Sequence, residues 1–172
     1  MTNKTVSTLI KAVTAQLSAV GIEDPAINAR LLIRQAFGWS ATHQLNNLSK
    51  SAPTDQLPLL ESLVKRRKNR EPLSYITGKA EFFKRQFSVD ERVLIPRPES
   101  EQLVTQTINY VRKLGIEHPR ITDIGTGSGC IMLSILKELK ISRGVGIDIS
   151  RKAIKVAKLN SKKLNLSNRS KF

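Results

Sequence analysis

Apolar side chains recur at helical spacing through the first part of the chain. The first set falls at positions i, i+3, i+4, i+7 and i+11 and consists of Val6, Leu9, Ile10, Val13 and Leu17. This spacing places the whole set on one face of a helix, which we expect Gly21 to end. Asp24-Pro25 predicts the start of a second helix, as an N-cap followed by proline at the first helical position, and Gly38 predicts its end.

Two more helices follow in the pattern, a short one over 42–48 and a longer one after the loop 51–55. The longer helix turns Leu57, Leu60, Leu63 and Val64 inward and carries a basic cluster over 65–70. Cations near a helix C-terminus complement the macrodipole, which is a sufficient structural reason for that cluster. Contact with a nucleic acid or the ribosome is the alternative. Glu71-Pro72 then breaks the helix.

The pattern beyond Pro72 changes from helix to strand. An apolar set predicts one strand, namely Phe82, Phe83, Phe87 and Val89. Asp90-Glu91 predicts a turn and 92–95 a second strand, so we expect a β-hairpin here. Pro96-Arg97-Pro98 forms a stiff extended strap, and 99–101 opens a helix. The buried stripe predicted for this helix consists of Leu103, Val104, Thr107, Ile108 and Val111.

A glycine-rich segment separates the next two elements. Ile121–Ile124 is a short apolar run suited to a buried parallel strand, and Asp123-Ile-Gly-Thr-Gly-Ser-Gly129 overlaps its end. A mostly apolar helix over 129–140 and a second strand over 144–148 follow, the latter ending in Asp148. This order of strand, glycine turn, helix, strand and acid is that of a dinucleotide-type βαβ unit, in which the acid takes a ribose hydroxyl.

The details of the glycine segment argue against a nicotinamide cofactor. The sequence motif that binds nicotinamide dinucleotides is G-x-G-x-x-G. Here the glycines are at 125, 127 and 129, and position 130 is Cys. Asp123 would repel a pyrophosphate and attract a cationic ligand. S-adenosylmethionine carries a sulfonium and an ammonium and no phosphate. The pattern is similar to the first motif of Rossmann-type methyltransferases, and a glycine turn without a ligand is the alternative.

The last part of the chain is strongly basic. Ser150 can cap a helix whose inward side chains would be Ile154, Ala157 and Leu164, and 167–170 is a turn. Residues 151–172 contain eight Lys or Arg and no acid, within a chain of net charge +15. A solvated helix face explains such a run. Contact of 151–171 with a nucleic acid or the ribosome is the alternative.

Composition narrows the class of protein. The 172 residues include one cysteine, Cys130, which excludes an internal disulfide and is expected to be a buried thiol in an apolar helix. His43 and His118 have no metal-type ligands near them in sequence, so we expect no metal site. No apolar stretch approaches the ~20 residues that span a bilayer, and no signal peptide opens the chain, so we expect a cytoplasmic location and no membrane contact.

Three segments together resemble one family. They are 72–78 (PLSYITG) with 81–83 (EFF), 93–101 (VLIPRPESE) and 123–129 (DIGTGSG). In this order they resemble the release factor glutamine methyltransferases. The resemblance implies methyl transfer from S-adenosylmethionine to the glutamine amide in the Gly-Gly-Gln motif of peptide chain release factors.

The resemblance also implies an α/β fold in three parts. These are a helical substrate-recognition bundle over 1–71, a linker with hairpin and strap over 72–98, and the first half of a Rossmann-type domain over 99–172. Asp148 matches the acid that binds the ribose, Asp123 supports the methionine end, and the Arg97 region lines the pocket. The cofactor loop is matched by Gly125, Thr126, Gly127, Ser128 and Gly129.

One motif of the family is absent. The substrate-holding Asn-Pro-Pro-Tyr does not occur, and its place would lie beyond Phe172. We therefore expect the N-terminal portion of such an enzyme, truncated or part of a split or fused protein, and inactive alone. No residue present is a convincing general base, and Glu99 and Glu101 fit better as first-turn helix carboxylates. The alternatives are an amino-methyltransferase of tRNA or DNA bases and a non-catalytic remnant.

Overall fold

A computed structural model describes residues 5–172 and divides the chain into two compact units. The first runs to Thr77 and the second is Gly78–Phe172. Each unit has its own hydrophobic core. Within residues 5–172, no helix combines the length and the hydropathy that crossing a bilayer requires.

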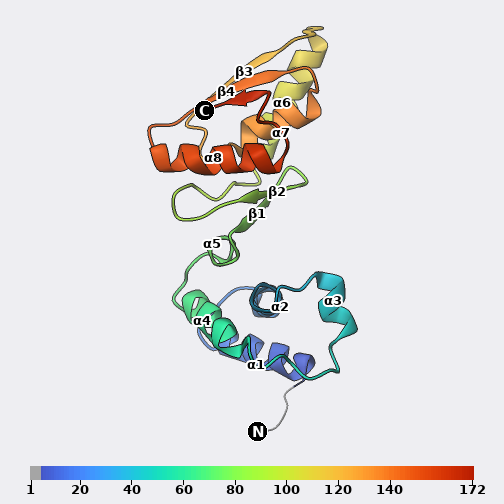
Figure 1. The fold of residues 1–172 in the computed structure, drawn as a ribbon, viewed down its shortest axis with the longest axis vertical. Helices are drawn as coiled ribbons and strands as arrows, with labels where there is room; N and C mark the ends of the chain where they lie inside the picture. The colour runs from blue at the N-terminus through green and yellow to red at the C-terminus, as the bar shows by residue number, and fades with distance from the viewer. Residues whose placement is uncertain (1–4) are drawn as a thin grey trace. The chain divides into compact units, whose positions relative to one another are not determined.

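Between residues 5 and 77, the named elements of the first unit are all helices (Figure 1). Its helices are α1 (Val6–Ser18), α2 (Pro25–Phe37), α3 (Ala41–Asn46), α4 (Leu57–Lys68) and α5 (Leu73–Thr77). The predicted apolar face of α1 is buried, and Thr5 caps this helix by accepting a 3.2 Å hydrogen bond from the Thr8 amide. The predicted inward positions of α4 are buried too, except Leu57, which packs partly exposed against the core.

Two details of the first unit differ from the prediction. Asp24 stands at the N-cap of α2, but its left-handed backbone (φ 46°) leaves the side chain without a capping bond. Instead, the side-chain Nδ2 of Asn28 donates hydrogen bonds to the backbone oxygens of Glu23 and Asp24, both at 3.0 Å. The helix α5 was not predicted; it forms directly after Pro72, whose carbonyl accepts the first hydrogen bonds of the turn.

The arginines of the basic cluster 65–70 donate hydrogen bonds to other residues of the first unit. Arg66 donates two hydrogen bonds to Glu71, at 2.8 and 2.5 Å, and this contact lowers the pKa of the Glu71 carboxyl. Arg67 donates to Asn28 and to the Glu71 carbonyl, and Arg70 donates to the carbonyls of residues 20 and 21. These contacts support the structural interpretation of the cluster.

The second unit contains a hairpin, three helices and a parallel sheet. In chain order these are β1 (Lys79–Phe82), β2 (Arg85–Ser88), α6 (Ser100–Lys113), β3 (Arg120–Ile124), α7 (Cys130–Glu138), β4 (Arg143–Ile147), α8 (Arg151–Lys163) and β5 (Ser170–Lys171). The sheet order is β3-β4-β5, all parallel, so the two βαβ crossovers place α7 and α8 on one side of the sheet (Figure 1). The third strand of this sheet, β5, begins at Ser170.

The hairpin is present, but its turn was placed wrongly. Phe82 pairs with Arg85, so Phe83-Lys84 is the turn and 92–95 is not a strand. Both turn residues have positive φ (48° and 59°), as a two-residue type I′ loop requires. Neither is Gly or Asn, so the sequence carries no turn signal at this point. The Phe83 amide is held by the Glu101 carboxylate at 2.7 Å, which gives Glu101 a structural role.

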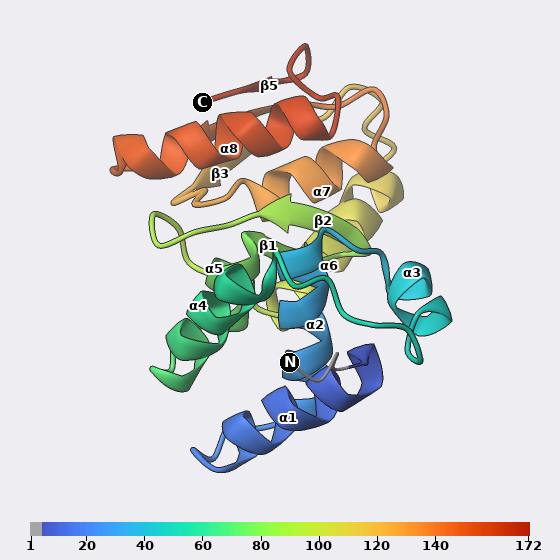
Figure 2. The ribbon, with the colours of Figure 1, turned by 60° about the horizontal axis from the view of Figure 1, so that its bottom comes forward.

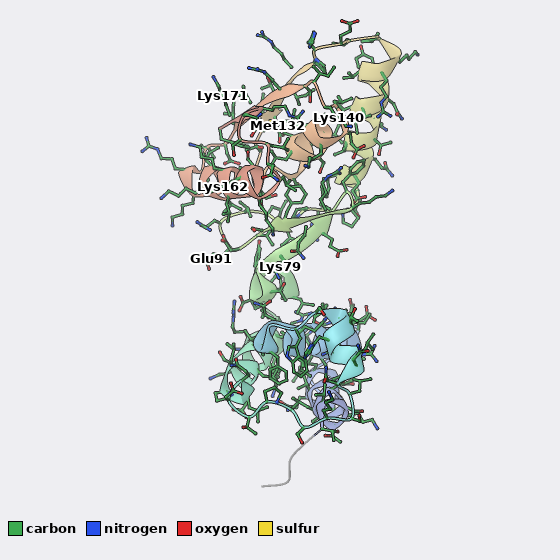
Figure 3. The ribbon with its side chains drawn as sticks, turned by 45° about the vertical axis from the view of Figure 1, so that its right-hand side comes forward. Lys79, Glu91, Met132, Lys140, Lys162 and Lys171 are labelled. Atoms are coloured by element: carbon green, nitrogen blue, oxygen red, sulfur yellow. The ribbon has the colours of Figure 1, made fainter. Side chains whose placement is uncertain are left out.

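Within residues 5–172, helices cover one face of the sheet and leave apolar side chains exposed on the other. Gly144 lies under α7, where an added Cβ would be 2.5 Å from the sulfur of Met132, which Figure 3 labels, so glycine permits α7 to pack closely on β4. On the other face Ile124, Val145 and Ile147 are 83%, 44% and 51% exposed. The prediction that β3 is a buried strand is therefore wrong, because its side chains alternate between exposed and half-buried. In α6, Val104, Ile108 and Val111 are buried as predicted, whereas Leu103 is exposed.

Candidate cofactor-binding site

The glycine loop 125–129 lies at the carboxyl ends of β3 and β4. Because these strands are parallel neighbours, both ends meet at one edge of the sheet, where ligands of open α/β sheets bind. The amides of Gly125 and Thr126 both donate to the Ile147 carbonyl, at 2.8 and 2.9 Å. The loop is therefore folded back onto the end of β4, next to Asp148.

Asp148 is bound to the loop on one side and to α8 on the other. Its Oδ2 accepts a 2.9 Å hydrogen bond from the Gly127 amide, and its Oδ1 accepts a 2.8 Å bond from the Ser150 amide. A carboxylate offers about four acceptor positions, so about two stay open on this half-buried group. The carboxylate is fixed in position and still able to bind hydroxyls.

Asp123 faces the same loop from β3. Thr126 donates its hydroxyl to Asp123 Oδ2 at 2.7 Å, and the Thr126 side chain is buried. The contact orients the carboxylate, and its other oxygen has no hydrogen bond among the described residues. No ion pair involving Asp123 or Asp148 occurs within residues 5–172, so both carboxylates can act on a cationic or hydroxyl-bearing ligand.

The glycines of the loop serve two different purposes. Gly125 and Gly127 have φ of 76° and 53°, and an added Cβ would meet nothing closer than 4.0 Å. Their conformation requires glycine, and the open space leaves the backbone accessible to a ligand. At Gly129 (φ 78°) an added Cβ would lie 3.0 Å from Leu133 and 3.4 Å from Ala157, so this glycine also permits packing of the loop against α7 and α8.

Asn160 is a site residue that sequence reasoning missed. It is fully buried in α8, where its Nδ2 donates to the carbonyls of Ser128 and Ser88, both at 2.9 Å, and its Oδ1 accepts from the Ser88 amide at 2.7 Å. One side chain thus joins the glycine loop, α8 and the hairpin. A signal was available: Ala153, Val156, Ala157 and Asn160 follow helical spacing, which is the buried face of α8.

The prediction of which side chains of α8 face the core was wrong, because the buried face of the helix lies at other positions. Ala157 is buried, but Ile154 and Leu164 are only partly buried, and Ala153 and Val156 replace them in the core. Ser150 caps the helix as predicted, accepting from the Ala153 amide at 3.2 Å. The lysine-rich sequence hid the phase because few of its residues are apolar.

The other residues singled out from the sequence, Arg97, Ser128 and Cys130, differ from one another in burial. Arg97 is exposed in the segment before α6, and within the described residues no hydrogen bond or ion pair joins its side chain to the loop. Ser128 is buried, and its hydroxyl lies next to the Cys130 thiol. Cys130 is buried as predicted, and burial raises the pKa of its thiol, so this residue fits packing rather than nucleophilic chemistry.

Comparison with known proteins relates this geometry to a family. Residues 8–78 match a family model described as the PrmC N-terminal domain, and residues 117–172 match one described as a methyltransferase domain. The release factor glutamine methyltransferase of Caulobacter vibrioides is 37% identical over 167 residues, covering 94% of this chain and 56% of that protein. The one from Rhodopirellula baltica is 35% identical over 167 residues, covering 96% and 56%.

Over most of its length the chain is similar to the N-terminal portion of the release factor glutamine methyltransferases. It is also 37% identical over 170 residues to the bifunctional methyltransferase of Rickettsia typhi, covering 90% of this chain and 33% of that protein. It therefore spans about half, or less, of the length of these relatives. The match to a methyltransferase domain and the parallel sheet confirm the predicted α/β class with a Rossmann-type methyltransferase domain.

Proposed function

We propose that this chain provides the cofactor-binding loop and the helical unit of an enzyme that methylates peptide chain release factors. The methyl donor is S-adenosylmethionine, and the acceptor is the side-chain amide of the glutamine in the Gly-Gly-Gln motif. The match to a methyltransferase domain and the similarity to release factor glutamine methyltransferases support the reaction class. The observation that carries the proposal within the structure is the geometry of Asp148 at the glycine loop.

The residues of the loop fit this cofactor. Asp148 keeps about two acceptor positions for the vicinal hydroxyls of a ribose, and its orientation is fixed by the amides of Gly127 and Ser150. Asp123 supplies negative charge for the ammonium or sulfonium end. Gly125 leaves space where the adenosine or methionine part would pass the backbone. Within residues 5–172, no lysine or arginine side chain hydrogen-bonds to the glycine loop. A site for a pyrophosphate would favour such cations.

When bound, the cofactor supplies an electrophilic methyl group on a sulfonium. The described residues contribute by binding and orienting it, because catalysis of this transfer rests mainly on in-line positioning. Thr126 holds Asp123, and Asn160 holds the Ser128 carbonyl, so both carboxylates and the loop are positioned before a ligand binds. Arg97, close in sequence to the helix α6, is a further proposed contact of the pocket.

For the helical unit we propose recognition of the release factor. A groove of about 830 Å³ lies between α1 and α4, with an apolar floor that includes Leu9, Val13 and Leu60. Lys65 and Lys68 of α4 stand at its rim. An apolar groove with a cationic rim suits a protein segment with apolar anchors and acidic flanks.

The test uses the protein in the longest form that its gene encodes. Incubation with methyl-labelled S-adenosylmethionine and purified release factor should label the release factor, and a release factor with Gln replaced by Ala in the Gly-Gly-Gln motif should stay unlabelled. Label on tRNA alone would assign the protein to the nucleic-acid methyltransferases. Cofactor binding without transfer to either substrate would favour the non-catalytic alternative.

A further inference from the structure

Helix α8 carries a basic stripe along its exposed face. The stripe consists of Arg151, Lys155, Lys158 and Lys162, which follow one another at spacings of four, three and four residues. All of them are exposed, on the side of the helix away from its buried face. At 1.5 Å per residue the stripe extends over ~16 Å.

The stripe has no acidic partners. Ion pairs in the described residues join Arg66 to Glu71, Arg85 to Glu138 and Arg92 to Asp90, and none involves α8. Like charges four residues apart on a helix destabilise it by about 0.2–0.5 kcal/mol per pair, and the stripe contains two such pairs. A purely solvated face would gain from interspersed glutamates, so the unrelieved charge indicates a negative ligand.

A shallow hollow of about 510 Å³ continues the stripe onto β5. Lys158 and Lys162 line one side of it and Lys171 the other, and Figure 3 labels Lys162 on α8 and Lys171 on β5. Ser161 and Ser170 share a 2.7 Å hydrogen bond that joins α8 to β5, two elements that run side by side in Figure 2. Ser167 is exposed in the turn and lines the hollow with its hydroxyl free to donate.

We propose that the stripe and this hollow bind the phosphodiester backbone of a single-stranded nucleic acid. A row of lysine ammoniums with a serine hydroxyl matches the groups that contact phosphate oxygens without reading bases. Lysine binds phosphate as a point charge that needs no fixed bidentate geometry, and the stripe consists of three lysines and one arginine. The apolar face of α8 is packed in the core, so this helix has no face to insert into a membrane.

The experiment measures binding of the chain to fluorescein-labelled oligouridylate by fluorescence anisotropy over a series of salt concentrations. The test variant carries Lys158→Gln, Lys162→Gln and Lys171→Gln. The matched control carries Arg112→Gln, Lys113→Gln and Lys140→Gln, which remove the same charge from exposed positions outside the stripe. Each phosphate contact contributes about −0.7 to the slope of log K against log salt for a single strand.

The test variant should lose at least about tenfold in affinity, and its salt slope should be shallower by about 2. The control should keep the slope of the unaltered chain, and both variants should retain its circular dichroism and melting temperature. An equal loss in the control would show attraction to net charge only and overturn the proposal. Equal competition by poly-glutamate would assign the surface to acidic proteins and also overturn it, as would equal competition by phosphatidylserine vesicles.

Discussion

Two side chains hold the glycine loop through its backbone, Asp148 at the Gly127 amide and Asn160 at the Ser128 carbonyl. Their roles differ. Asp148 is half-buried with acceptor positions left open, whereas Asn160 is fully buried and uses both donors and its oxygen within the fold. We therefore expect Asp148 to act on the ligand and Asn160 to act on the conformation of the loop.

Asp148→Asn should weaken binding of S-adenosylmethionine by about tenfold or more, because hydrogen bonds to a charged group contribute about 1.5–3 kcal/mol. The measurement is a titration followed by amide chemical shifts of the loop glycines. Asp90→Asn removes the same charge from a carboxylate paired with Arg92 and serves as the control. Equal affinity in the two variants would remove Asp148 from the site.

Asn160→Ala should lower the stability of residues 78–172 by about 3 kcal/mol, since it leaves the Ser88 amide, the buried Ser128 carbonyl and the partly buried Ser88 carbonyl without this partner. Hydrogen–deuterium exchange resolved by peptide would show faster exchange in β2 and in the glycine loop. Asn168→Ala, at an exposed turn position, should change stability by less than about 0.5 kcal/mol.

Among the elements, those with strong periodicity could be predicted from sequence and the hairpin turn could not. The face of α1 follows from five apolar residues at helical spacing, and the loop with Asp148 follows from the order of strands and glycines. Phe83-Lys84 adopts positive φ only because tertiary contacts hold it, among them Glu101 on the Phe83 amide. The exposed face of the sheet could not be predicted either, since a strand of apolar residues predicts burial on both faces.

Lys84→Gly should stabilise the hairpin by up to about 1 kcal/mol, because a residue with a Cβ at positive φ costs about 1–2 kcal/mol and glycine does not. Hydrogen–deuterium exchange of the amides in residues 78–172 during thermal unfolding measures this change in stability. Gln86→Gly, within β2, should have the opposite sign and cost about 0.5–1 kcal/mol. Destabilisation by both variants would show that the turn is not strained.

For the molecule as a whole, acid should remove the stability that paired carboxylates contribute to the fold. Arg66 lowers the pKa of Glu71 below its value in the unfolded chain, so this pair contributes stability above the unfolded pKa of about 4.5. The contribution is lost as the pH falls through the lower folded pKa. Because the pair is partly exposed, its contribution should stay below about 1 kcal/mol.

Glu71→Gln should therefore lower the free energy of unfolding near neutral pH and have little effect in strong acid, where the native carboxyl is protonated as well. Urea unfolding at the two pH values, followed by the fluorescence of Trp39 in the same unit, gives the comparison. A difference between variant and unaltered protein that is the same at both pH values would contradict this assignment.

The bare sheet face has a calorimetric consequence. Ile124, Val145 and Ile147 are hydrated before unfolding begins, so melting of residues 78–172 adds less new apolar surface to water than a sheet covered on both faces would. Its heat-capacity increment should fall below the usual ~12–15 cal/mol/K per residue. The stability curve of this unit would then be unusually flat, so that its free energy of unfolding changes little between cold and ambient temperatures.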